Sequence, residues 1–258
     1  PKITNQQQDT LDYTTQFRII NTKQLLPIPK HKDKKTINTW LKDLMQKEYI
    51  ERIYDPHTFG ENTKPAIFFM GINGIRYLKA IGDMDLDSIR KLYKEKTRKQ
   101  PFINGSILIA DCCLTLTTKS TNETIFAFAT ESDYLNPDSP MNFLKTLKPH
   151  LYFSKQTGKI KKYYLLEIFD ETLPSYRVRK RIRSYIDFFF SNEWEDNTGK
   201  AFPVVLFICP TKPHFIRTKR YAKKILEENQ NPEDLQIRFT TFDLVKEFSV
   251  IGNIWEEV

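Results

Sequence analysis

TINTWLKDLM, residues 36–45, has the clearest helical pattern in the amino-terminal third of this chain. Its apolar residues recur at i, i+4, i+7 and i+8, which predicts a helix with one side against a core. That side comprises Ile37, Leu41, Leu44, Met45 and the neighbouring Trp40. The other side is expected to expose Thr36, Asn38, Thr39, Lys42 and Asp43.

The segments around this helix follow the order of a winged helix. A short apolar helix signal at residues 22–26 and a basic loop at residues 30–35 precede it. Two β-rich runs, residues 50–54 and 66–72, follow it and flank a polar turn. In a helix-turn-helix with a hairpin wing, the second helix enters the major groove of duplex DNA. The sequence therefore predicts a DNA-binding module.

The rest of residues 1–100 is assigned to the same domain. Residues 1–10 are polar and are expected to fray, and residues 11–20 are predicted to form a first helix. Asn73 is expected to cap a helix that ends near Ile81. Residues 88–99 are expected to form a charged connector helix.

From residue 101 to 258 the pattern changes to strands interspersed with helices. Residues 107–116 form a buried helix or strand, since periodicity does not separate the two. Strands are predicted at residues 124–130, 150–154, 163–169, 204–209 and 237–241, and helices at 175–190 and 215–229. We therefore expect a second, mixed-sheet domain and an α/β or α+β protein.

Charge agrees with this division. Residues 1–100 hold 19 Lys and Arg against 12 Asp and Glu, a net charge of +7 out of +8 for the whole chain. Such a basic excess is expected of a domain that neutralises phosphates. A lysine-rich composition with no DNA role is the alternative.

Other features bound the class of protein. The three cysteines, Cys112, Cys113 and Cys209, lie in apolar runs and are expected to be reduced and buried. The sequence shows no signal-peptide core and no apolar run near 20 residues, so we expect a cytoplasmic protein without a membrane partner. The chain has only eight glycines and no phosphate loop, which excludes an ATPase, a kinase or a dinucleotide enzyme.

The candidate DNA contacts follow from the predicted module. Asn38, Thr39 and Lys42 have the chemistry to contact base edges. Phosphate contacts are expected from Lys34, Lys35 and Thr36, and from Arg52, His57 and Lys64 of the wing. The alternatives are an ordinary solvated helix face or a module for protein interaction and dimerisation.

A second set of candidates lies in the later domain. Glu167 interrupts an apolar strand and Asp170 lies at its end, a pattern that metal-dependent nucleases use to bind Mg²⁺ or Mn²⁺. The alternative is that both carboxylates pair with arginines or face solvent. The helix that follows is basic and could bind a nucleic-acid backbone through Arg177, Arg179, Lys180 and Arg183. The run from Arg217 to Lys224 is interpreted as a solvated face.

Several short motifs resemble the replication-relaxation family of plasmid and other mobile-element proteins. They are TWLKDL (39–44), YIER (49–52), FMGINGIRYL (69–78), LKPH (147–150), LEIFD (166–170) and RIRSY (181–185). Some members resemble relaxases that nick DNA with a restriction-endonuclease-like fold of the PD-(D/E)xK type. The resemblance thus implies that fold for residues 101–258.

The motifs depart from the nuclease pattern that the resemblance implies. His150 occupies the position of the metal-binding Asp in the nuclease pattern. Phe169 occupies the position of its Lys, two residues after Glu167, and Arg181 that of the Lys in the following helix. Glu167 and Asp170 remain as the implied metal ligands, to which Asp111 or Glu131 would add a carboxylate. If the domain is active, Glu167, Asp170, His150 and Arg181 form the catalytic set. The departures favour a degenerate nuclease core without a cofactor.

The sequence thus predicts a sequence-specific DNA-binding accessory or regulatory protein of a plasmid, phage or integrative element. Its expected partners are double-stranded DNA, a second copy of the chain and proteins of the replication or transfer machinery. Two alternatives stay open, a Mg²⁺- or Mn²⁺-dependent nicking relaxase and a winged-helix interaction module.

Overall fold

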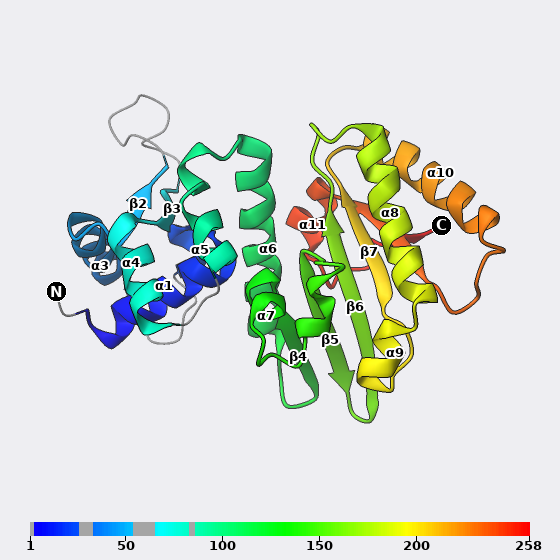
Figure 1. Ribbon diagram of the computed structural model, residues 1–258, viewed down its shortest axis with the longest axis horizontal. Helices are drawn as coiled ribbons and strands as arrows, with labels where there is room; N and C mark the ends of the chain where they lie inside the picture. The colour runs from blue at the N-terminus through cyan, green and yellow to red at the C-terminus, as the bar shows by residue number, and fades with distance from the viewer. Residues whose placement is uncertain (1–2, 26–32, 54–64, 83–85) are drawn as a thin grey trace. The chain divides into compact units, whose positions relative to one another are not determined.

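The computed structural model describes residues 3–25, 33–53, 65–82 and 86–258 of the chain (Figure 1). It divides into two compact units, residues 1–114 and 115–258. The division lies inside a long helix, α6 (Gln100–Lys119), and so comes later than the boundary expected near residue 100. Helices and strands mix in the chain, with a mixed six-stranded sheet, as the α/β prediction requires.

The first unit is a run of helices around a small sheet. Its elements are α1 (Asn5–Phe17), β1 (Ile19–Asn21), α2 (Thr22–Leu25), α3 (Lys34–Gln46), β2 (Ile50–Arg52), β3 (Ile67–Met70) and α4 (Ile72–Ile81). A further helix, α5 (Leu86–Leu92), and a 3₁₀ turn, η1 (Glu95–Thr97), lead to α6. The three strands pair antiparallel in the order β1-β3-β2.

Helix α3 forms as its sequence predicts. The Asp33 carboxylate caps it by accepting from the backbone N–H groups of Lys35 and Thr36, which begins the helix at Lys34. Of the predicted core side, Ile37, Leu41 and Leu44 are buried, and Trp40 and Met45 are half-buried. The apolar period therefore does set the inward face of α3.

Two predictions about the amino terminus are wrong. Residues 5–10 are helical rather than frayed, because Thr4 and Gln7 form a capping box at the start of α1. The helix also ends at Phe17 instead of continuing to residue 20. Ile19 and Ile20 extend into β1, where they pair with Phe69 and Phe68 of β3. Pairing with a strand about fifty residues later overrides the local helical period.

The predicted cap of α4 is also wrong. Gly71 is the N-cap residue, and a side chain there would place its Cβ 2.5 Å from the Glu48 carbonyl oxygen. Asn73 lies inside the helix, and its Nδ2 donates to the Lys47 carbonyl at 3.0 Å. The connector predicted at residues 88–99 is broken into α5 and η1, where buried Glu95 pairs with Arg18 and Arg98.

The second unit is built on a six-stranded sheet. Its strands are β4 (Thr124–Ala129), β5 (Leu151–Thr157), β6 (Ile160–Ile168), β7 (Val204–Cys209), β8 (Ile237–Thr241) and β9 (Glu256–Glu257), in the order of the chain. Strands β4, β5 and β6 form an antiparallel meander, and β6, β7 and β8 run parallel. All five predicted strands are present, and residues 107–116 belong to helix α6.

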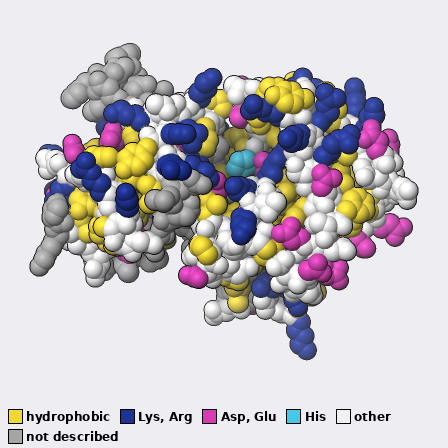
Figure 2. All heavy atoms as spheres, in the orientation of Figure 1, with side chains coloured by type: hydrophobic (Ala, Val, Ile, Leu, Met, Phe, Trp, Pro, Cys, Tyr) yellow, Lys and Arg dark blue, Asp and Glu magenta, His cyan; other side chains and the backbone are white. Residues whose placement is uncertain are grey.

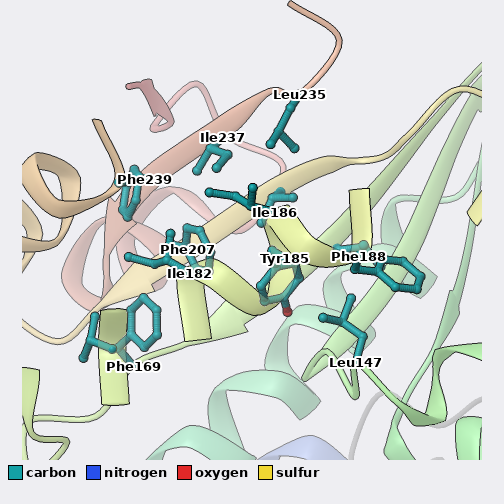
Figure 3. Close-up of a cluster of buried hydrophobic side chains, with 14 of the residues drawn as sticks. Leu147, Phe169, Ile182, Tyr185, Ile186, Phe188, Phe207, Leu235, Ile237 and Phe239 are labelled. Atoms are coloured by element: carbon teal, nitrogen blue, oxygen red, sulfur yellow. The ribbon is translucent and has the colours of Figure 1, made fainter. Parts of the chain in front are cut away.

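Two long helices connect the parallel strands. They are α8 (Ser175–Phe190) and α10 (Lys212–Glu228), close to the predicted bounds. Shorter helical segments are α7 (Glu131–Leu135), η2 (Asn142–Lys145), α9 (Glu193–Thr198) and α11 (Phe242–Phe248). Phe207 of β7 packs in one core cluster with Ile182 and Ile186 of α8 and with Phe215 and Ile225 of α10. Figure 3 shows the α8 side chains directed toward Phe207.

Both long helices therefore cover the same face of the sheet, as expected for successive crossovers between parallel strands (Figure 1). Their buried sides are apolar, which leaves their charged residues on the outer side. The three cysteines are buried thiols, as predicted. Cys112 and Cys113 lie in α6, and Cys209 lies in the core beneath α8 and α10. Burial raises the pKa of Cys112 and Cys209 to about 12.

Helix α6 is the one helix among the described residues that is long and apolar enough to cross a membrane by length and composition. A core helix of a soluble protein passes the same test. Ile103 near its start packs against Ile19, Ile67 and Phe69 of the small sheet. These contacts are those of a core helix in the first unit.

Candidate functional site

Glu167 is a charged residue in an apolar strand. It lies at the end of β6, where it is paired in register with Phe207 of the central strand β7. Only 5% of its surface is exposed. An ionised carboxylate at such a position is costly unless it is paired and hydrogen-bonded. Its partners therefore decide what the site can do.

Two side chains of α8 bind the same oxygen of Glu167. Arg181 Nη2 donates to Oε2 at 2.7 Å and the Tyr185 hydroxyl donates to it at 2.8 Å. The two residues are four apart on the helix, so they project to the same side and meet over the strand. Figure 3 shows Tyr185 on the sheet-facing side of α8.

The loop before β5 holds Arg181 in place. Its guanidinium donates to the Leu147 carbonyl at 2.6 Å and to the Lys148 carbonyl at 2.8 Å. Lys148 adopts a positive φ of 50°, which turns the chain toward His150. The arginine thus joins helix, strand and loop through a planar set of donors.

His150 completes the cluster. Its Nδ1 lies 3.1 Å from the Ile168 backbone nitrogen, which donates to it, and 3.4 Å from Glu167 Oε1. When Nδ1 is unprotonated it accepts from Ile168, and when it is protonated it can donate to the carboxylate. Burial acts to lower the pKa of His150, but the Glu167 charge outweighs it and the pKa is raised.

The same charges stabilise Glu167 in its ionised form. Burial acts to raise the pKa of the carboxyl, but His150 and Arg181 lower it to about 2. Desolvation, with Glu167 next in importance, raises the pKa of Tyr185 well above its usual value, so this hydroxyl remains a donor. The result is an ion-pair network with buried Glu167 at its centre and with the His150 side chain exposed at its edge.

The other candidate carboxylates have partners of their own. Asp170 Oδ1 accepts from the backbone and the hydroxyl of Thr172 at 2.7 and 2.6 Å. Asp111 accepts from Gln24 within the first unit. Glu131 acts on His150 through its charge. Across the described ranges, no group of three or more His, Cys, Asp and Glu side chains could hold a metal ion.

A second candidate surface lies on α3. Lys35, Asn38, Thr39 and Lys42 recur at i, i+3, i+4 and i+7, on the side opposite the buried residues, and all four are exposed. With Asp33 they line an open depression in the surface. Thr36 is exposed beside them. Asp43 is half-buried and binds Gln7 and Lys47 rather than lying free in solvent.

The remaining predicted DNA contacts are dispersed. Arg52 of β2 is half-buried, and its buried Nε has no hydrogen-bond partner among the described residues. His57 and Lys64 lie outside the described residues, and so does the side chain of Lys34. Arg177, Arg179, Lys180 and Arg183 are exposed on α8 of the second unit.

A family model described as replication-relaxation matches residues 11–205, from α1 to the start of β7. The chain belongs to the replication-relaxation family. The match includes both α3 and the Glu167 network, and it stops before α10. No curated protein and no solved structure matches the chain.

Family membership supports a replication-related role in a plasmid or other mobile element. The motifs that carry the resemblance lie where the structure can interpret them. LEIFD supplies Glu167, RIRSY supplies Arg181 and Tyr185, and LKPH supplies His150 and two carbonyls. Three separate stretches that carry the resemblance thus meet in one network.

One member of the network was missed by the sequence analysis. Tyr185 belongs to the apolar stripe of α8, and its hydroxyl had no predicted partner. The four-residue spacing between Arg181 and Tyr185 was the available signal, since such residues share a helix face. The carbonyls of Leu147 and Lys148 had no signal, because backbone acceptors are common to every residue.

Proposed function

We propose that this chain is a sequence-specific DNA-binding accessory or regulatory protein of a plasmid, phage or integrative element, acting in its replication, transfer or transcription. The observation that carries the proposal is the outer side of α3. There Lys35, Asn38, Thr39 and Lys42 form one exposed stripe over a buried apolar side. Lysine and amide side chains at this spacing suit the major groove.

The order of elements in the first unit supports the winged-helix interpretation. Strand β1 precedes α2 and α3, and the pair β2 and β3 follows. Strand β3 of the β2–β3 hairpin also pairs with β1, and β1 leads directly into α2. The sheet therefore connects the hairpin to the helices. This arrangement would hold α3 at a fixed angle to the hairpin, whose connecting residues 54–64 lie outside the described residues.

Charge along α3 assigns different roles to its residues. The Asp33 carboxylate already accepts from backbone N–H groups of the first turn, so these N–H groups are not the proposed phosphate site. Lys35, in that first turn, is assigned to the phosphate backbone. Asn38, Thr39 and Lys42 lie further along and are assigned to base edges.

The nicking alternative gains no support from the second unit. Mg²⁺ and Mn²⁺ require free oxygen ligands. Both oxygens of Glu167 face cationic or hydrogen-bonding groups of the chain, and Asp170 is bound to Thr172. The residues present therefore do not fit such a metal ion. We propose that the Glu167 network stabilises a degenerate nuclease core.

Electrophoretic shifts with the element's own origin and intergenic DNA test the proposal. Lys42→Ala is expected to weaken binding to the specific duplex by about 1–3 kcal/mol. Lys35→Ala and Lys34→Ala are each expected to lower the slope of log K against log salt by about one, without changing the preference for the specific duplex over an unrelated one. Lys79→Ala, which removes an exposed charge from α4, is the matched control. Equal losses of affinity in all four variants, on specific and unrelated duplex alike, would contradict the assignment of α3.

A further inference from the structure

The outer sides of α8 and α10 carry two basic runs that the fold brings together. Both helices cover one face of the sheet. Arg179 of α8 lies over the Tyr221 ring of α10 at 5.2 Å, and Arg183 pairs with Glu228 at 2.9 Å. These contacts fix which sides of the two helices adjoin.

Six exposed cations lie along these adjoining and outer sides. On α10, Arg217 and Lys224 lie four residues before and three residues after Tyr221, the residue in contact with α8, and Arg220 adjoins both of them on the helix surface. On α8 the same surface is formed by Arg179, Lys180 and Arg183. We call these six residues the α8/α10 basic surface. Figure 2 shows dark blue side chains gathered over this part of the second unit.

The protein itself does little to neutralise this surface. The acidic residues of the two helices, Asp187, Glu227 and Glu228, all lie in the last turns, and Glu228 pairs with Arg183. Within the part of the chain that the structure describes, no ion pair forms at Lys180, Arg217, Arg220 or Lys224. None of the six lies in the last turn of its helix, where the helix dipole stabilises cations. Like charges held this close repel unless an anion binds.

We infer that the α8/α10 basic surface is a second DNA contact, which binds the phosphate backbone of duplex DNA without reading its sequence. The inference rests on the proposed function only in taking DNA as the ligand. Arginine and lysine on two parallel helices offer many donors to phosphate oxygens. All six side chains are donors, which suits the acceptor oxygens of phosphate groups.

Helix α10 contributes a part of this surface that the sequence does not predict. Its basic run reads as a solvated face in the sequence, because nothing there indicates that α8 lies beside it. Residues 212–228 also lie beyond the part of the chain that the family model matches. A backbone contact through α10 would therefore be a property of this chain rather than one inferred from its family.

The test measures affinity for a short duplex of scrambled sequence over a series of salt concentrations. The triple variant Arg217→Ala, Arg220→Ala, Lys224→Ala leaves the contacts of Arg179 and Arg183 in place. It is expected to reduce the slope of log K against log salt by about 2 to 3, since each phosphate contact contributes about 0.9. The charge-preserving variant Arg217→Lys, Arg220→Lys, Lys224→Arg is expected to retain the slope.

The matched control removes three exposed lysines from the β5–β6 hairpin, as Lys155→Ala, Lys159→Ala, Lys162→Ala. It lowers the net charge equally and is expected to change the slope by less than about one. Equal effects from both triple variants would overturn the inference. Unchanged DNA binding combined with lost binding of poly-glutamate would also overturn it, in favour of an acidic protein partner.

Failure of this surface is distinct from failure of the proposed function. A scrambled duplex requires no base reading, so the result does not depend on Lys42. If Lys42→Ala leaves site preference intact while the α10 triple variant lowers the slope, only the proposed role of α3 falls. The opposite result removes the α8/α10 surface alone.

Discussion

Arg181 is the residue on which the Glu167 network depends. Its guanidinium neutralises a carboxylate that is 5% exposed and also satisfies two backbone carbonyls. Removing one partner of a buried pair leaves the other charge uncompensated, which costs far more than the pair contributes in an exposed setting.

Arg181→Ala is accordingly expected to destabilise the second unit by about 3–5 kcal/mol, measured by urea unfolding. The control is Arg183→Ala two residues later, whose pair with Glu228 is exposed and is worth less than about 1 kcal/mol. Equal losses in free energy of unfolding would show that the network contributes no more than a surface ion pair.

His150 is expected to make stability depend on pH near neutrality. Its pKa is raised in the folded protein, where Glu167 and Glu131 favour the charged form and Arg181 opposes it. A raised folded pKa gives stability that is complete below the unfolded pKa of 6.5 and is lost as pH rises through the folded value.

The free energy of unfolding should therefore fall as the pH rises above about 6.5, and His150→Ala should flatten that fall. Glu167 has the opposite sign. Its folded pKa of about 2 lies below the usual 4.5, so its contribution is present above pH 4.5 and is lost toward pH 2. A His150→Ala protein with an unchanged fall above pH 6.5 would show that another group is responsible.

For single residues, the sequence indicates buried charges better than it indicates hydrogen bonds. Glu167 was identifiable because it interrupts an apolar strand, and His150 and Arg181 because they replace expected residues of a family pattern. Tyr185 and the two carbonyls were not, since a hydroxyl in an apolar stripe and a loop carbonyl gain meaning only from what lies opposite them.

Helix α4 shows how tertiary contacts override local preference. Gly74 is a poor helix former in its interior, yet a Cβ there would lie 2.3 Å from both the Tyr49 carbonyl oxygen and the Met70 sulfur. Gly105 in α6 has the same helical setting but has no atom within 4 Å of a built Cβ. The two glycines form a matched pair.

Gly74→Ala is expected to destabilise the first unit by about 1–3 kcal/mol through overpacking, although alanine favours helix. Gly105→Ala is expected to stabilise it by about 0.5–1 kcal/mol through helix propensity. Thermal unfolding of both variants measures the difference. Stabilisation by both substitutions would mean that α4 does not approach β3 as closely as the structure indicates.

Element types were predictable where one periodicity dominates. Strands β4 to β8 and helices α3, α8 and α10 follow directly from their apolar patterns, whereas β9, formed by two exposed glutamates, has no such pattern. The errors lie where a distant partner decides, as in β1, or where a glycine cap displaces a better local candidate, as at Gly71. Neither the pairing nor the close approach is encoded within a short window of sequence.

For the whole molecule, the proposal separates DNA binding from DNA cleavage. Supercoiled element DNA incubated with the protein and Mn²⁺ is expected to show no nicking that depends on Glu167, because this carboxylate is bound by Arg181 and Tyr185. Nicking by the wild type that disappears in Glu167→Ala, with folding verified by circular dichroism, would establish the relaxase alternative instead.

The most direct test of the central claim asks whether the outer side of α3 lies against base pairs. A photo-activatable cross-linker is placed at Asn38 of α3. As the control, it is placed at Lys79 of α4, which is also an exposed position of the first unit. We expect cross-links from position 38 to bases of the element's origin duplex, and we expect origin DNA but not scrambled DNA to compete for them. Base cross-links from position 79 but not from position 38 would contradict the assignment of α3 to the major groove. Failure of the protein to bind any duplex at low salt would also contradict it.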